Sequence, residues 1–315
     1  MRWSTMAALG TVLALAGACG SSSDSEVKAD GGGAAGSAGA AGTTGTAGAT
    51  GAGGSGGGCA PRATFAEASH TIVNVTWRAA TAAMAGSGQV HLWGKTVLTA
   101  SGNTLSGTLQ ACGSVLPATS LNALGGGGMI LIEIPGAAWD APSMPRFQVA
   151  ATQTGWNVGS TLSYGYAALI GFTMADAATA PWPSSYTGIT MTNDADGDMS
   201  PGLTAVPRSG GGYTLPPLSI LQVSRADRIY SVLRNVASTT LTRTSCDQAS
   251  GPVTFTHFEN HVIGCHVSGG GDCSSSEVNF VDQNRTIYEI TGATAQTTIV
   301  GETATCADVR AALPM

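Results

Sequence analysis

The chain has 315 residues, which is enough for one sizeable domain or two small ones beyond a leader segment. Only 10% of the residues are charged, whereas about a quarter is usual, and glycine is abundant with 45 residues. The formal net charge of −6 at pH 7 and the lack of a basic stripe make nucleic acid an unfavourable partner.

The N-terminus has the layout of a secretory signal. Arg2 precedes an apolar run over Met6–Ala18, which is shorter than the roughly 20 residues that a membrane-spanning helix needs. The run ends in small residues at Cys19, and this end resembles the lipobox of bacterial lipoproteins. The resemblance implies that residues 1–19 are a lipoprotein signal peptide and that Cys19 is lipidated. Ala16 stands where lipoboxes usually carry leucine, and an ordinary cleavable signal with an incidental cysteine is the alternative.

Residues 20–58 are almost wholly Gly, Ala, Ser and Thr, apart from a charged patch at Asp24–Asp30. Such a segment has too little apolar surface to offset its ordering entropy, so it is predicted to be a disordered linker spanning on the order of 35 Å. A lipid on Cys19 would make this linker a membrane tether. Gly20 favours the outer membrane of the cell envelope, and secretion without an anchor is the alternative. The whole layout resembles secreted lipoproteins of the myxobacterial type, which implies no activity.

Residues 59–315 are predicted to form a single all-β domain. Short alternating runs punctuated by Gly, Pro and Asn favour an antiparallel β-barrel or β-sandwich. A short C-terminal helix is expected over Cys306–Leu313, with Thr305 as its cap and Pro314 at its end. The predicted strands are Thr71–Arg78, Gln89–Thr99, Thr104–Cys112, Met129–Ile134, Gln148–Thr154, Leu162–Thr173, Ile229–Val236, Thr239–Thr244, Val253–Ile263, Thr286–Thr291 and Thr297–Val300.

This domain holds an even number of cysteines, which in an exported protein indicates up to three disulfides. Glycines 269–271 lie midway between Cys265 and Cys273, so we expect these two cysteines to face each other across a hairpin. Cys59 and Cys306 lie near the two ends of the domain and are a candidate pair that would join them. The cysteines are Cys59, Cys112, Cys246, Cys265, Cys273 and Cys306.

Asp194, Asp196 and Asp198 alternate in the segment NDADGDMSPG. On a turning backbone, alternate aspartates aim several carboxylate oxygens at one hard cation, as Ca²⁺ prefers. The segment resembles the D-x-D-G-D core of thrombospondin type 3 and dockerin-like calcium loops. The resemblance implies that the three aspartates bind calcium and stiffen a loop. Met199 and Ala205 replace the glycine and the closing glutamate of that pattern, and an acidic surface turn is the alternative.

A second group of ligand-type side chains lies in the strand expected before the glycine hairpin. With a period of two, His257, Glu259 and His261 share a face with Phe255 and Ile263. Three such side chains could hold zinc or supply acid–base groups, although the two histidines would stand about 13 Å apart along an ideal strand. Ordinary polar residues on a sheet face are the commoner alternative.

Aromatic side chains are spread through the first half of the domain. Exposed rings would stack on sugars, whereas buried rings would fill the core, which is the favoured interpretation. These residues are Trp77, Trp93, Trp139, Trp156, Trp182, Tyr164, Tyr166 and Tyr186.

The sequence holds no clear local signature of a catalytic nucleophile or a phosphate-binding loop. We therefore predict a non-catalytic, exported envelope lipoprotein whose domain binds an extracellular or periplasmic ligand or supports the envelope. An exported hydrolase acting on glycans or peptides is the alternative.

Overall fold

The computed structural model of the chain describes residues 58–79, 85–120, 129–130, 132–208, 213–214 and 225–315. The expected signal peptide (1–19), the lipidation site Cys19 and the linker up to residue 57 lie outside these described residues. The described part is mostly β-structure and ends in a short helix, as predicted. No helix in these ranges is long and apolar enough to cross a membrane.

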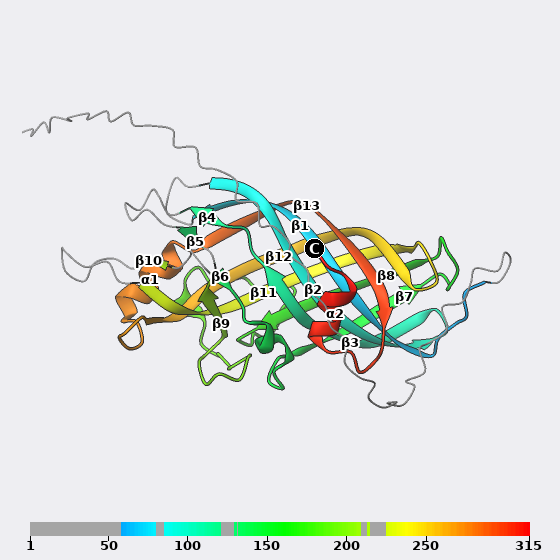
Figure 1. Cartoon of the computed structure of the whole chain (residues 1–315), viewed down its shortest axis with the longest axis horizontal. Helices are drawn as coiled ribbons and strands as arrows, with labels where there is room; N and C mark the ends of the chain where they lie inside the picture. The colour runs from blue at the N-terminus through cyan, green and yellow to red at the C-terminus, as the bar shows by residue number, and fades with distance from the viewer. Residues whose placement is uncertain (1–57, 80–84, 121–128, 131, 209–212, 215–224) are drawn as a thin grey trace, which may run out of the picture. The chain divides into compact units, whose positions relative to one another are not determined.

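Eight long strands form a closed antiparallel barrel (Figure 1). They follow one another around the ring in chain order, each antiparallel to the next, and the last strand pairs with the first. Of the two predicted architectures, the barrel is the one formed. The eight strands are β1 (Thr64–Ala79), β2 (Ala85–Ser101), β3 (Thr104–Val115), β7 (Arg146–Gln153), β8 (Thr161–Ile170), β11 (Arg225–Arg243), β12 (Gln248–Val267) and β13 (Thr286–Val300).

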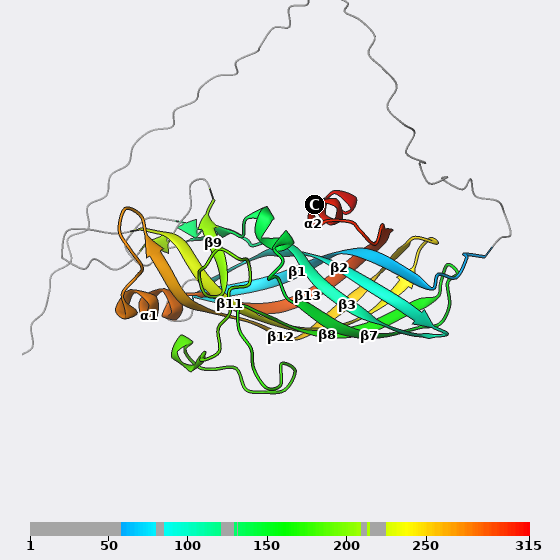
Figure 2. The ribbon, with the colours of Figure 1, turned by 90° about the horizontal axis from the view of Figure 1, so that it is seen from below.

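Shorter elements lie between the long strands. β9 (Leu203–Pro207) continues along β11 beyond the end of β8, and β6 (Ile132–Glu133) pairs with β9. Figure 2 shows α2 on one side of the barrel and the loops that connect β8 to β9 on the opposite side. The remaining elements are β4 (Thr119–Ser120), β5 (Met129–Ile130), β10 (Tyr213–Thr214), the 3-10 helices η2 (Gly136–Asp140) and η3 (Tyr186–Gly188), and the helices α1 (Ser275–Gln283) and α2 (Cys306–Ala312).

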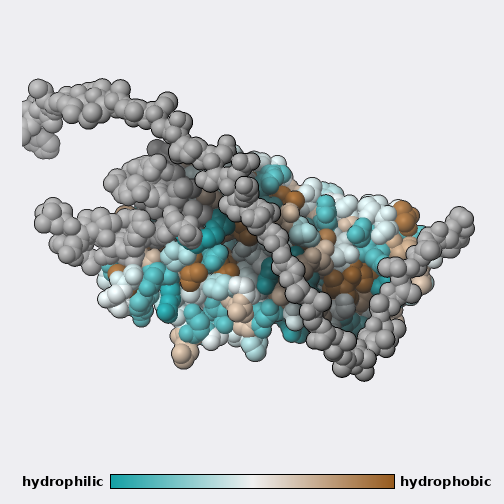
Figure 3. Space-filling model, viewed as in Figure 1, coloured by the Kyte–Doolittle hydropathy of each residue, from teal (hydrophilic) through white to brown (hydrophobic). Residues whose placement is uncertain are grey.

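Hydrophobic side chains fill one end of the barrel, because alternate residues of each strand face the interior. Trp156 closes this end: Phe65 packs edge-to-face against it with ring centroids 5.0 Å apart, and the Arg243 guanidinium lies 4.5 Å from its centroid. On the face seen in Figure 3, by contrast, hydrophobic patches are small and separated. The fully buried side chains at this end are Phe65, Leu98, Leu105, Leu162 and Leu241.

Two pairs of predicted strands are continuous in the structure. Ile229–Val236 and Thr239–Thr244 both belong to β11, and Thr286–Thr291 and Thr297–Val300 both belong to β13. The residues between them do not break the strands, since their ladders to neighbouring strands run on through these positions. Helix α1 is not among the predicted elements, although the capping box that starts it is visible in the sequence as Ser274 followed by Glu277.

A bulge in β12 changes which of its side chains share a face. Consecutive residues Val236 and Ala237 of β11 pair with His257 and Phe255, so Thr256 between them is an extra residue of β12. Phe255 therefore packs with Phe258 in the barrel interior, whereas His257 faces outward. The prediction that Phe255 and His257 share a face is wrong for this reason.

The six cysteines form three disulfides, the number that their count allows. Cys265 pairs with Cys273 across the glycine turn, and the Cys273 N–H donates to the Cys265 carbonyl at 2.7 Å, which confirms this expected pair. The candidate pair Cys59–Cys306 is wrong. Cys59 instead joins Cys246 in the turn between β11 and β12, and Cys306 joins Cys112 of β3.

Candidate functional site

A cavity of about 160 Å³ lies inside the barrel. It starts beside the filled end, at Leu109, Tyr164 and Val253, and extends to β6 and β9, where Ile132 and Leu203 border it. An apolar cavity of about 150 Å³ is known to hold one benzene molecule. The interior therefore has room for one compact molecule of about that size.

The walls of this cavity are mainly apolar and rich in aromatic rings. Burial raises the pKa of Tyr166 to about 12, and it raises the pKa of Tyr164 still further. Both phenols are therefore neutral and keep their hydroxyl protons near neutral pH. The aromatic residues of the lining are Trp93, Trp139, Phe147, Tyr164, Tyr166, Phe258 and Tyr288.

Two carboxamides also line the cavity, Asn235 from β11 and Asn260 from β12. Neither side chain forms a hydrogen bond to another residue of the described ranges. The hydroxyls of Ser69 and Thr239 are already used, because they donate to backbone carbonyls of Gly94 and Pro252. The polar atoms of a bound molecule would therefore meet free amide groups on neighbouring strands.

Buried polar side chains lie beyond the lining residues at the inner end of the cavity. Glu67 is the next inward-facing residue after Ser69, and Thr96 lies opposite it on β2. Buried polar atoms are normally satisfied, so water or the polar atoms of a ligand are needed to complete this group. The buried atoms without a partner here are Glu67 Oε2, Thr96 Oγ1, Gln153 Oε1, Thr297 Oγ1 and both Nε and Nη2 of Arg243.

Glu67 and Arg243 are both buried, but in the described structure they form no ion pair with each other. Burial raises the pKa of Glu67 to about 7, although the positive charge of Arg243 acts in the opposite direction. Glu67 is thus a carboxyl group that changes its charge near neutral pH inside the barrel.

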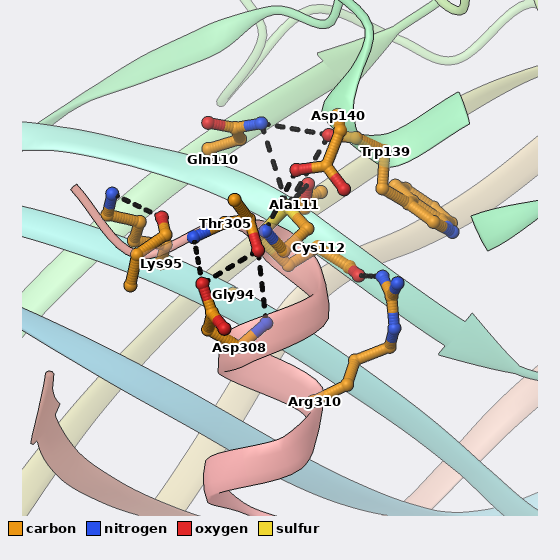
Figure 4. Close-up of a disulfide and its surroundings, with 12 residues drawn as sticks. Gly94, Lys95, Gln110, Ala111, Cys112, Trp139, Asp140, Thr305, Asp308 and Arg310 are labelled. Carbon is orange, nitrogen blue, oxygen red and sulfur yellow. Dashed lines mark hydrogen bonds between the residues drawn. A yellow bond between two sulfur atoms is a disulfide. The ribbon is translucent and has the colours of Figure 1, made fainter. Parts of the chain in front are cut away.

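Helix α2 covers the wall of the barrel beside β3 (Figure 4). The Cys112–Cys306 disulfide joins the two elements, and the Cys306 N–H donates to Asp140 of η2 at 2.8 Å. Thr305 caps the helix, since its hydroxyl accepts from the Asp308 N–H, which confirms the predicted cap. The disulfide thereby ties α2 to β3, and the hydrogen bond ties η2 to the start of α2.

A second hollow of about 370 Å³ lies between β3, β6 and the end of α2. It shares Trp93, Trp139 and Ile132 with the lining of the interior cavity. The ladder between β3 and β7 ends at Gln110, so the residues of β3 from Ala111 to Val115 have no β7 partner. This side of the barrel is the candidate entrance to the cavity.

The predicted calcium ligands do lie together. Oxygens of Asp194, Asp196 and Asp198 all fall within 4.8 Å of one another. Backbone N–H groups of Gly197 and Met199 donate to Asp194, and these bonds outweigh its burial and lower its pKa. Burial raises the pKa of Asp196, whose Oδ1 is buried without a partner. Met199 takes a left-handed φ of 71°, so it adopts the conformation for which the calcium-loop pattern uses glycine.

His257, Glu259 and His261 all face outward from β12, as their spacing predicts, but they do not meet at one point. Glu259 pairs with the buried Arg234 of β11, whose Nη2 also lies 3.0 Å from His257 Nδ1. The guanidinium lies 5.2 Å from the centroid of Trp182, which belongs to the loops between β8 and β9. This first group holds those loops against the barrel.

His261 belongs to a separate, fully buried group. Its Nδ1 lies 2.8 Å from Asp282 of α1 and its Nε2 lies 2.8 Å from the Pro183 carbonyl. Both ring nitrogens thus have a hydrogen-bond partner, one a carboxyl group and the other a backbone carbonyl. No ring nitrogen of His261 is left to bind zinc or to transfer a proton.

The core interpretation of the tryptophans is confirmed for those in the barrel. Four tryptophans are at most 9% exposed and cannot stack on sugars: Trp77, Trp93, Trp139 and Trp156. Trp182 is only partly buried, and it stacks on His261 with centroids 5.3 Å apart.

Sequence reasoning missed the polar group at the inner end of the cavity. Its signal is the alternation of Phe65, Glu67 and Ser69, which places one charged residue on the inward face of β1. The predicted strand begins only at Thr71, whereas β1 begins at Thr64, so this pattern fell outside it.

Comparison of the chain with protein-family models, with curated proteins and with solved structures finds no match.

Proposed function

We propose that the barrel is a non-catalytic binding domain that carries one compact, largely apolar small molecule in its interior. The observation that carries this proposal is the cavity of about 160 Å³ between the strands. Barrels of about eight strands are wide enough to hold one small ligand. Aromatic walls supply apolar contact, and the free carboxamides of Asn235 and Asn260 can fix the orientation of the guest.

The test is calorimetric titration and thermal unfolding with a panel of single-ring compounds such as toluene, indole and p-cresol. Ala168→Phe fills the cavity, because Ala168 is buried and lines it. Ala150→Phe is the matched control, since Ala150 is exposed on β7. At least one compound should bind the wild type and the control but not Ala168→Phe. Failure of the whole panel to bind the wild type would contradict the proposal.

We further propose that this domain belongs to an envelope lipoprotein, anchored through Cys19 and residues 20–58 to the outer membrane. The signal-like N-terminus and the three disulfides support export to an oxidising compartment. Membrane fractionation of cells expressing the full chain tests it. The wild type should sediment with membranes, and Cys19→Ser should appear in the soluble exported fraction. A Cys19→Ser variant that stays with the membranes would overturn the anchor.

The loop that holds Asp194, Asp196 and Asp198 is proposed as a weak structural calcium site. The free Oδ1 of Asp196, beside two further carboxylates, supports it. Ca²⁺ should raise the melting temperature relative to EGTA, because a ligand that binds only the folded state stabilises it. Asp196→Asn should abolish this rise, and an unchanged wild-type melting temperature would remove the site.

A further inference from the structure

Just beyond the residues that line the inner end of the cavity lies a buried carboxyl group, one oxygen of which lacks a hydrogen-bond partner among the described residues. Glu67 is 2% exposed, and its Oε2 accepts no hydrogen bond from any described residue. It lies one inward-facing position, about 7 Å along the strand, from Ser69 in the cavity lining. The position opposite Glu67 on β2 is Thr96, whose β3 neighbour Leu109 also lines the cavity. Glu67 therefore lies one inward-facing position beyond the residues that line the space a ligand would occupy.

The groups that face Glu67 do not supply the missing cation. The charged and titratable side chains around it are Arg243 of β11 and Tyr164 of β8, with Tyr166 next to Tyr164. Arg243 is not within ion-pair contact of Glu67, and its guanidinium lies 4.5 Å from the Trp156 centroid at the filled end. The two tyrosines are neutral. A buried carboxylate is costly unless a positive charge or several donors pair with it.

Aromatic rings line the remaining walls of the cavity, and their faces attract organic cations. We propose that the natural ligand is a small organic amine, bound as its ammonium ion, with the ammonium directed at Glu67 and an apolar body of about one ring among the aromatic walls. This inference rests on the proposed binding function and names the chemical class of its ligand.

Proton release gives the proposal a signature that needs no variant. Because burial holds the pKa of Glu67 near 7, most Glu67 is protonated at about pH 6 before binding. An ammonium ligand would favour the carboxylate, so binding would expel the proton from Glu67. An uncharged ligand of the same shape would leave that proton in place.

The experiment is calorimetric titration of the full-length protein at about pH 6 in two buffers of different ionisation enthalpy. The probes are benzylamine, benzyl alcohol and toluene. The variants are Glu67→Gln and the control Glu289→Gln, which alters an exposed carboxylate outside the cavity lining.

Wild type and Glu289→Gln should bind benzylamine about tenfold or more tightly than benzyl alcohol, a difference of about 1.4 kcal/mol, and should release up to about one proton. Glu67→Gln should lose both the preference and the release. Equal binding of benzylamine and benzyl alcohol by the wild type, or binding of benzylamine without proton release, would overturn the amine while leaving the binding function intact. Binding of none of the three probes would remove the binding function and the inference with it.

Discussion

Glu67 and His261 show two ways in which this protein buries an ionisable side chain. His261 is enclosed by acceptors on both ring nitrogens, and it links β12 to α1 and to the loops between β8 and β9. Glu67 lies among other buried polar side chains without an ion-pair partner, and it keeps an unsatisfied oxygen near a cavity. The first arrangement is typical of a structural contact. The second is typical of a site in which water or a ligand completes the hydrogen bonding.

Glu67 should make the stability of the protein depend on pH. Its pKa is raised from 4.5 to about 7 in the folded state, so folding favours the proton. The contribution of protonated Glu67 to the free energy of unfolding is complete below about pH 4.5, and it is lost as the pH rises through about 7. Urea unfolding of the wild type against Glu67→Gln should show a stability difference that shifts by on the order of 3 kcal/mol between about pH 4 and pH 8. A difference that stays constant across that range would refute the buried, unpaired state of Glu67.

Asp282→Asn should destabilise the protein strongly. Asp282 bonds His261 and accepts from the backbone N–H groups of Val262 and Tyr186, so the change disrupts a buried polar group that joins three segments of the chain. We expect a loss of about 3 kcal/mol or more in the free energy of unfolding. Glu289→Gln is the control, because Glu289 pairs with Arg78 at an exposed site, where we expect a loss of about 1 kcal/mol or less. Similar losses for the two variants would contradict the account of His261.

At the scale of elements, the alternation of side chains predicted the long strands well, because one face of each strand meets an apolar interior. It did not predict where strands continue through Ala237 or how far β1 extends toward Thr64, since neighbouring strands decide this through their ladders. The bulge at Thr256 is likewise set by the fit to β11. The C-terminal helix could be predicted because its signals, Thr305 and Pro314, are local.

The disulfide between Cys112 and Cys306 should contribute more stability than the one between Cys265 and Cys273. The first joins residues 194 apart in the sequence and the second residues only 8 apart. Chain-entropy arguments give about 5 kcal/mol for the long loop and about 2–3 kcal/mol for the short one. Chemical unfolding of the two double-alanine variants measures both losses. A larger loss for the Cys265–Cys273 variant would contradict this ranking.

At the scale of the whole molecule, the sequence favoured a barrel and a sandwich equally. The choice depends on the pairing of β13 with β1, two strands at opposite ends of the domain, and strand alternation carries no information on such distant partners. The cavity follows from the same closure. Its lining comes from all eight long strands, so no segment of the sequence reveals it alone. The aspartate loop was predictable because all three carboxylates lie within five residues.

The central claim is that the barrel encloses a space that a guest can occupy. A crystal structure of the protein under xenon pressure tests it most directly, because xenon enters apolar cavities of about this size. We predict xenon density inside the barrel among Leu109, Tyr164 and Val253, and its loss in Ala168→Phe. An interior packed with side chains, with no xenon between those three residues in the wild type, would contradict the account.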